Sequence, residues 1–144
     1  MDQAVKTLID GLNEDLANEY ASVIMYTYNA ATVSGLSRQV LKPFFEQEVP
    51  DELGHASYLA EKISMLGGIP VVKPAPVEQP KEVKAMLEQA LKAETETIER
   101  YKQRLEQADA VGEIALKVRL EDMIADETRH KEELQRLLED PRLC

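Results

Sequence analysis

Hydrophobic side chains recur along this 144-residue chain at steps of four and three residues, the spacing at which they share one face of a helix. In the first such segment, residues 2–33, the inward positions are Leu12, Leu16, Glu19, Val23, Tyr26, Ala30 and Val33. In the second, residues 37–66, they are Phe45, Val49, Glu52, Ala56, Leu59, Ile63 and Leu66. Residues 81–108 and 110–139 repeat the same step. The pattern predicts four helices, and no stretch shows the alternation typical of a strand.

Glycine and proline mark the boundaries of these segments. Ser34-Gly35 ends the first helix, and Gly67-Gly68-Ile69-Pro70 ends the second. The chain that follows, up to Pro80, is rich in proline and reads as extended, so it can run the length of a bundle. We therefore predict an all-α, antiparallel four-helix bundle that forms one domain over residues 1–144, with one long crossover between the second and third helices.

The composition of the chain mainly excludes certain classes of function and location. The net charge of −10 and the lack of a basic arm argue against binding to nucleic acid. The single cysteine, Cys144, cannot form a bridge within the chain, which suits a reducing compartment. No apolar run approaches the length of a membrane span, and Met1-Asp2-Gln3 lacks the features of a secretory signal. We expect a cytoplasmic protein with neither nucleic acid nor membrane as a partner.

One chemical pattern occurs twice, with every member displaced by 75 positions. The two copies are Glu19, Tyr26, Asp51, Glu52 and His55, and Glu94, Tyr101, Asp126, Glu127 and His130. In each copy the first Glu precedes the Glu-x-x-His by one helix, a turn and part of a second helix. Two helices that each supply one Glu, and two that each supply Glu-x-x-His, provide the ligand set of a paired-metal carboxylate centre inside a bundle.

The spacing gives this ligand set a physical reason. Helical residues three apart share a face, so Glu52 and His55 can reach one point, as can Glu127 and His130. Four buried carboxylates would repel one another, and two divalent cations remove that cost. A single Glu-x-x-His is a weak signal, because solvated helices carry such pairs freely, but two copies on hydrophobic seams are specific. The predicted metal ligands are Glu19, Glu52, His55, Glu94, Glu127 and His130.

The donor types also indicate the metal and its surroundings. Carboxylate and imidazole ligands without thiolate favour iron, with manganese or zinc as other possible occupants. Asp51 and Asp126 are candidates to accept a hydrogen bond from a ligand imidazole, each from a histidine on another helix. Tyr26 and Tyr101 fit ordinary core packing better than a role beside the metal, and such a role has more support for Tyr26.

These residues resemble the motifs of the ferritin-like superfamily, and of bacterioferritin in particular, over nearly the whole chain. The motifs are Asn18-Glu19, Asp51-Glu52-Leu53-Gly54-His55, Glu94 and Asp126-Glu127-Thr128-Arg129-His130. The resemblance implies a ferritin-like fold in which Glu52 and Glu127 bridge two iron ions. Glu19 and His55 would complete one position, and Glu94 and His130 the other. Tyr26 matches a tyrosine near the ferroxidase centre, so the expected catalytic residues are Glu52, Glu127 and Tyr26.

The chain departs from bacterioferritin at two points. Leu53 stands where bacterioferritin has its haem-ligating Met, so we expect no haem. Too few residues follow Pro141 for the fifth helix that packs around the four-fold axes of the 24-subunit cage. A dimer or a 12-subunit shell therefore becomes as plausible a homo-oligomer as the full cage. Rubrerythrin is a poorer match, because its cysteine pairs are missing and Thr97 replaces its additional Glu.

The resemblance implies an iron-storage ferroxidase that oxidises Fe(II) with O2 or H2O2. The alternative is a rubrerythrin-like oxidase or peroxide reductase, with two iron or two manganese ions, that acts as a dimer without storage. A third possibility is a metal-stabilised bundle that serves only as an interaction module.

Overall fold

The computed structural model describes residues 1–143, and Cys144 lies outside the described residues. The helices are α1 (Gln3–Thr32), α2 (Arg38–Met65), α3 (Val83–Ala110) and α4 (Ile114–Leu137), followed by the short 3-10 helix η1 (Pro141–Leu143). No strand occurs among these residues, so the predicted all-α class is confirmed. The predicted boundary between the last two helices lay too early. α3 continues to Ala110, and the turn before α4 contains Gly112 with a positive φ of 76°.

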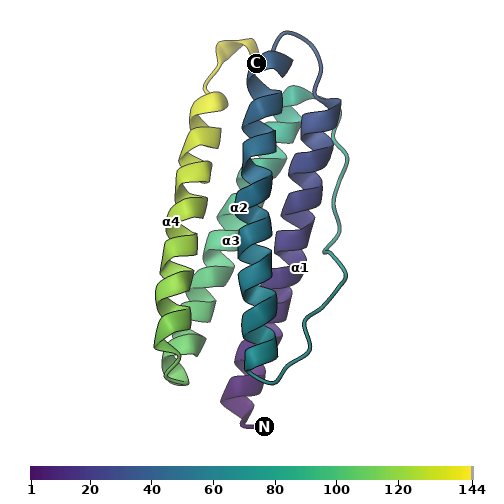
Figure 1. Ribbon diagram of the computed structural model, residues 1–144. Helices are drawn as coiled ribbons and strands as arrows, with labels where there is room; N and C mark the ends of the chain where they lie inside the picture. The colour runs from purple at the N-terminus through teal and green to yellow at the C-terminus, as the bar shows by residue number, and fades with distance from the viewer. Residues whose placement is uncertain (144) are drawn as a thin grey trace.

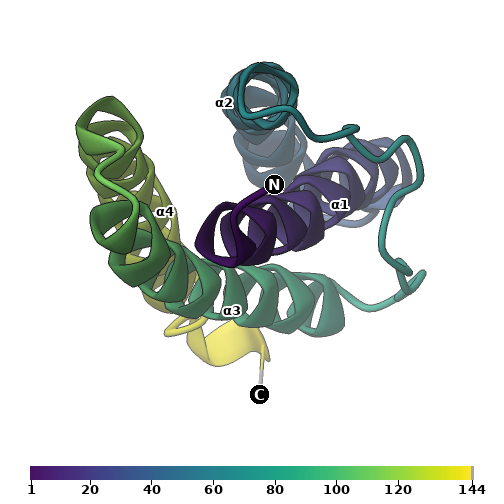
Figure 2. The ribbon, with the colours of Figure 1, turned by 90° about the horizontal axis from the view of Figure 1, so that it is seen from below.

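The helices form two antiparallel hairpins, α1 with α2 and α3 with α4 (Figure 1). The chain leaves the lower end of α2, runs along the outside of the bundle and enters α3 at the upper end. As a result α2 and α3 run in the same direction. Seen from below, the four helices surround one axis and the crossover lies outside α1 (Figure 2). The predicted bundle with a single long crossover is confirmed.

The crossover is held against α1 by hydrogen bonds. The side-chain amide of Asn13 donates to the Ile69 carbonyl (3.1 Å) and accepts from the Val71 N–H (2.9 Å). Farther along, the Ala75 N–H donates to the Ala17 carbonyl at 2.9 Å. An extended segment has no internal hydrogen bonds, so these contacts satisfy part of its backbone and fix its path.

Two hydrophobic clusters fill the bundle, one in each half. The first includes Leu8, Leu12, Leu16, Leu59, Ile63, Leu116 and Leu120, and the second includes Met25, Tyr26, Phe45, Met86, Leu87 and Leu134. Between the clusters the buried side chains are acidic: Glu19, Glu52, Glu94 and Glu127 are each at most 1% exposed. The fold therefore places four carboxylates at mid-height, between two apolar clusters.

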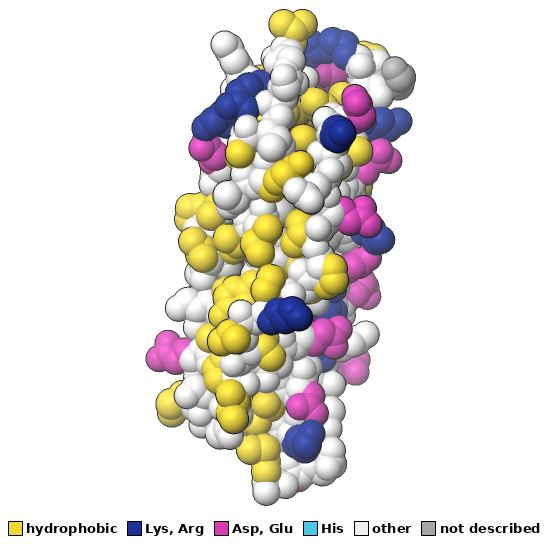
Figure 3. All heavy atoms as spheres, turned by 90° about the vertical axis from the view of Figure 1, so that its right-hand side faces the viewer, with side chains coloured by type: hydrophobic (Ala, Val, Ile, Leu, Met, Phe, Trp, Pro, Cys, Tyr) yellow, Lys and Arg dark blue, Asp and Glu magenta, His cyan; other side chains and the backbone are white. Residues whose placement is uncertain are grey.

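The outer surface combines charged and hydrophobic regions. On the face that carries the crossover, hydrophobic side chains extend along much of the bundle, while acidic and basic side chains gather along one edge (Figure 3). Ile69 and Val72 of the crossover are 86% and 91% exposed. Among residues 1–143, no helix combines the length and apolar composition that crossing a lipid bilayer would require.

Candidate metal centre

The six predicted ligands come together near the middle of the bundle. α1 supplies Glu19, α3 supplies Glu94, and α2 and α4 each supply a Glu and a His one turn apart. All six side chains are buried, including His55 at 3% and His130 at 4% exposure. The four-three step points these side chains inward, and their places near the middle of each helix bring them to one height.

Two groups of potential ligand atoms share one member. The first group is Glu19, Glu52, His55 and Glu127, and the second is Glu48, Glu52, Glu94 and His130. Within each group the ligand atoms lie within 4.8 Å of one another. The carboxylate of Glu127 also lies between the two imidazoles, with Oε1 3.2 Å from His55 Nδ1 and 3.9 Å from His130 Nδ1. Glu52 thus belongs to both groups, and Glu127 approaches both imidazoles.

The polar atoms in this cluster fit a pair of cations. Buried polar atoms normally have hydrogen-bond partners, because leaving one unpaired costs free energy. The atoms without one here are Glu19 Oε2, Glu48 Oε2, Glu52 Oε1 and Oε2, His55 Nδ1, Glu94 Oε2, Glu127 Oε1 and His130 Nδ1. All are oxygens or imidazole nitrogens, the donor types that iron and manganese accept. These residues therefore fit a two-metal carboxylate centre.

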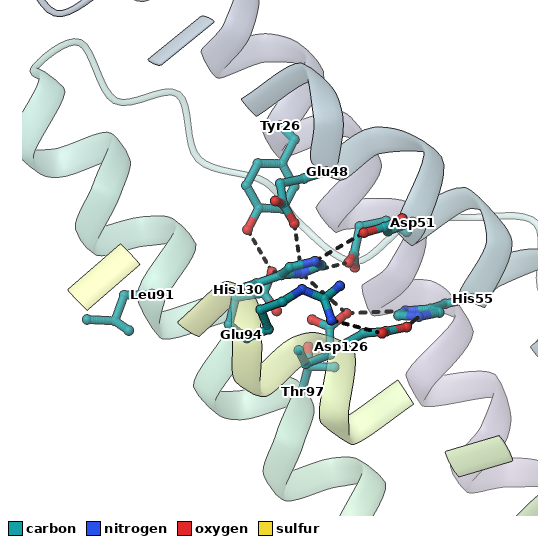
Figure 4. Close-up of polar contacts among 12 residues, drawn as sticks. Tyr26, Glu48, Asp51, His55, Leu91, Glu94, Thr97, Asp126 and His130 are labelled. Atoms are coloured by element: carbon teal, nitrogen blue, oxygen red, sulfur yellow. Dashed lines mark hydrogen bonds and ion pairs between the residues drawn. The ribbon is translucent and has the colours of Figure 1, made fainter. Parts of the chain in front are cut away.

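Each histidine is oriented by an aspartate from the other hairpin (Figure 4). His55 Nε2 lies 3.2 Å from Asp126 Oδ2, and His130 Nε2 lies 3.2 Å from Asp51 Oδ2. The predicted contact of each aspartate with a histidine on another helix is confirmed. A carboxylate accepts hydrogen bonds, so the contact favours a proton on Nε2, and Nδ1 is the atom that can bind a metal once it has lost its own proton.

Two buried tyrosines make a second crossed pair of contacts. Tyr26 donates to Glu94 Oε1 at 2.6 Å, and Tyr101 donates to Glu19 Oε1. Burial, and then the surrounding carboxylates, raises the pKa of both phenols well above 10, so each hydroxyl stays protonated as a donor. The sequence favoured Tyr26 over Tyr101 for a role beside the metal. The structure does not distinguish them in this way, because each tyrosine donates a hydrogen bond to one of the candidate ligands.

Without cations, protons would limit the charge of this cluster. Burial, followed by repulsion from Glu127, raises the pKa of Glu19 to about 7. Burial also raises the pKa of Glu52 well above its ordinary value, with Glu19 and Glu127 adding to the shift. For His55, burial alone would lower the pKa, but contacts with Glu127 and Glu19 raise it to about 9. A metal ion that binds here therefore replaces protons.

Glu48 is a cluster member that the sequence analysis missed. The hydrophobic pattern placed Val49 on the buried seam of the second helix, but Glu48 is the buried residue, at 4% exposure, and Val49 is half-buried. The hydrophobic pattern selects valine rather than glutamate as the buried residue. The spacing could have identified Glu48, because it precedes Glu52 by four residues and so lies on the same helical face.

Comparison with known proteins identifies the family. A model of the ferritin-like domain matches residues 9–144 of the chain. The protein belongs to the ferritin-like family. A crystal structure of a ferritin-like, diiron-carboxylate protein from Bacillus anthracis is 62% identical to this ferritin-like domain, with a TM-score of 0.94, and the match covers 96% of this chain and 99% of that one.

Two further relatives share less sequence with this ferritin-like domain. Bacterioferritin from Brucella melitensis is 27% identical over 133 residues, which cover 92% of this chain and 83% of the relative. A structure described as a dodecameric thioferritin, the bacterioferritin-related protein of Bacteroides fragilis, is 26% identical with a TM-score of 0.87 and covers 97% and 88% of the two chains. The resemblance to bacterioferritin inferred from the motifs is confirmed.

Proposed function

We propose that this protein binds two Fe(II) ions in the central cluster and oxidises them with dioxygen or hydrogen peroxide. The observation that carries the proposal is the pair of buried four-residue groups that share Glu52. The 62% identity to a protein described as diiron-carboxylate supports iron over other occupants. The same donor types also bind manganese and zinc.

Each side chain of the cluster has a separate role in this proposal. Glu19 and His55 complete one metal position, and Glu94 and His130 the other. Glu52 and Glu127 would hold both ions, and the two Fe(II) ions together would supply the two electrons that one oxidant accepts. The negative charge of these two glutamates also favours Fe(III) over Fe(II). The role of Tyr26 is to hold Glu94 in place by its hydrogen bond. Leu53 offers no ligand atom, and no haem takes part in this proposal.

Replacing Glu127 with alanine tests the assignment. The variant removes one proposed bridge and should lose rapid Fe(II) oxidation, because the two ions are no longer held together. The measurement is stopped-flow absorbance after Fe(II) is mixed with O2 or with H2O2, together with circular dichroism to check the helical fold. Glu121→Ala, an exposed change on the same helix, is the matched control and should oxidise Fe(II) at the rate of the unchanged protein. Equal rates in both variants would contradict the proposal.

Iron storage needs a closed shell in addition to the oxidation site. The hydrophobic side chains along one face (Figure 3) and the dodecameric relative support a homo-oligomer. The solution mass of the protein, measured with its metal content on the same chromatographic peak, separates the two possibilities. A shell of 12 or 24 subunits supports storage, whereas a dimer supports an oxidase or peroxide reductase with the same metal centre.

A further inference from the structure

Glu48 extends the cluster beyond the six ligands found by the repeated pattern. It lies on α2, and its side chain points toward the imidazole of His130 (Figure 4). Its Oε2 is 2.7 Å from His130 Nδ1, closer than any other carboxylate oxygen that approaches this atom. The side chain is buried, and this oxygen has no hydrogen-bond partner.

Glu48 has no equivalent in the second copy of the internal repeat, so the surroundings of His130 and His55 differ. Every ligand of the first hairpin has an equivalent 75 positions later in the second, but the equivalent of Glu48 is Met123. Met123 is 1% exposed and belongs to the hydrophobic core. The position beside His130 therefore gains a carboxylate, and the position beside His55 gains none.

Simple ion pairing with His130 does not explain why a carboxylate is buried here. Among residues 1–143, no Lys or Arg forms a salt bridge with Glu48, and His130 is its one ion-pair partner. When His130 binds a metal through Nδ1, it no longer has a proton on that atom to share with Glu48. A buried carboxylate without a partner costs several kcal/mol. Binding to the same ion removes that cost.

We propose that Glu48 is a seventh metal ligand, which binds the ion beside His130 and makes this position the tighter of the two. The inference rests on the proposed two-ion function and adds an order of filling to it. A carboxylate is a hard, negatively charged donor, so it strengthens binding of a hard cation more than a neutral residue can. The His130 position fills first, and the His55 position fills second.

Anaerobic titration with Co(II) tests this assignment without any oxidation step. Calorimetry measures the two dissociation constants, and the visible absorbance of Co(II) reports the number of ligands. The unchanged protein should bind two ions in separate steps. In Glu48→Gln, the tighter step should weaken by about tenfold or more, because loss of a ligand is at least as damaging as loss of a group that supports one. The two steps should then approach each other, and the absorbance per ion should rise as the coordination number falls.

Two companion variants separate ligand loss from other effects. Glu48→Met places the residue of the second repeat at this position and should weaken the tighter step as strongly as Glu48→Gln. Glu46→Gln removes the same charge from an exposed site on α2, where Glu46 pairs with Lys42, and should leave both constants unchanged. If Glu48→Gln binds both ions as the unchanged protein does, this inference is wrong while the two-ion function stands. If the unchanged protein binds fewer than two ions, both are wrong.

Discussion

A single aspartate orients each of the two histidines that we propose as metal ligands. Asp126 on α4 bonds to His55 on α2, and Asp51 on α2 bonds to His130 on α4, so each hairpin orients a histidine of the other. The two aspartate side chains are 39% and 44% exposed, unlike the buried ligands. Changes at these positions can therefore alter metal binding while the hydrophobic core stays intact.

Asp126→Asn should weaken metal binding by about tenfold or more, the usual cost of losing a group that orients a ligand histidine. The asparagine amide can donate to Nε2, which would move the imidazole proton to Nδ1 and block the ligand atom. Anaerobic Co(II) titration measures the effect, and urea unfolding checks that the fold is retained. Asp122→Asn, an exposed change on the same helix, is the control. Equal affinities in the two variants would show that Asp126 does not orient the ligand.

At the scale of helices, α1 and α3 are joined by a buried ion pair below the carboxylate cluster. Arg104 donates to Asp15 through Nε at 2.7 Å and through Nη2 at 3.1 Å, and both residues are almost fully buried. The guanidinium fits because Gly11 has no side chain: a Cβ there would lie 2.6 Å from Arg104 Cζ. The close approach of the two helices thus depends on one glycine.

Gly11→Ala should destabilise the protein by about 2–4 kcal/mol. Displacing Arg104 removes the closer of the two arginines that face Asp15, because Arg100 Nε lies farther away, at 3.8 Å from Asp15 Oδ1. Loss of a buried partner costs about 3–5 kcal/mol, and the better helix propensity of alanine offsets about 1 kcal/mol. The free energy of unfolding from urea titration measures the change. Gly54→Ala is a matched control in α2, where a Cβ would meet open space, and it should be neutral or slightly stabilising. Equal effects of the two substitutions would refute the packing argument.

At the scale of the whole molecule, the sequence could predict the features that both helical hairpins have in common. The four-three step gave the helices, and the 75-residue repeat gave six buried cluster members, because each hairpin must present the same face to the centre. Glu48 and the Asp15–Arg104 pair have no such repeat, since Met123, Ala90 and Asn29 stand at the equivalent positions. Their burial depends on how close the helices come to one another, which periodicity does not specify.

The acidic cluster also makes the metal-free protein less stable as the pH rises. The pKa of Glu19 rises from 4.5 to about 7 on folding, and that of His55 rises from 6.5 to about 9. The folded state therefore binds protons more tightly than the unfolded state. The resulting stabilisation is complete below pH 4.5 for Glu19 and below pH 6.5 for His55, and it is lost as pH rises through about 7 and about 9.

We accordingly expect the free energy of unfolding, measured with urea and a chelator, to decrease steadily from pH 5 to pH 9 across this window. Excess Co(II) should reverse the trend, because metal binding needs deprotonated ligands and strengthens as protons leave. Glu19→Gln removes the carboxyl that titrates near pH 7, so its metal-free stability should fall less between pH 5 and pH 7 than that of the unchanged protein. A metal-free stability that rises over this range would mean that the cluster carboxylates are already ionised in the folded state, and that the centre does not depend on cations to offset their repulsion.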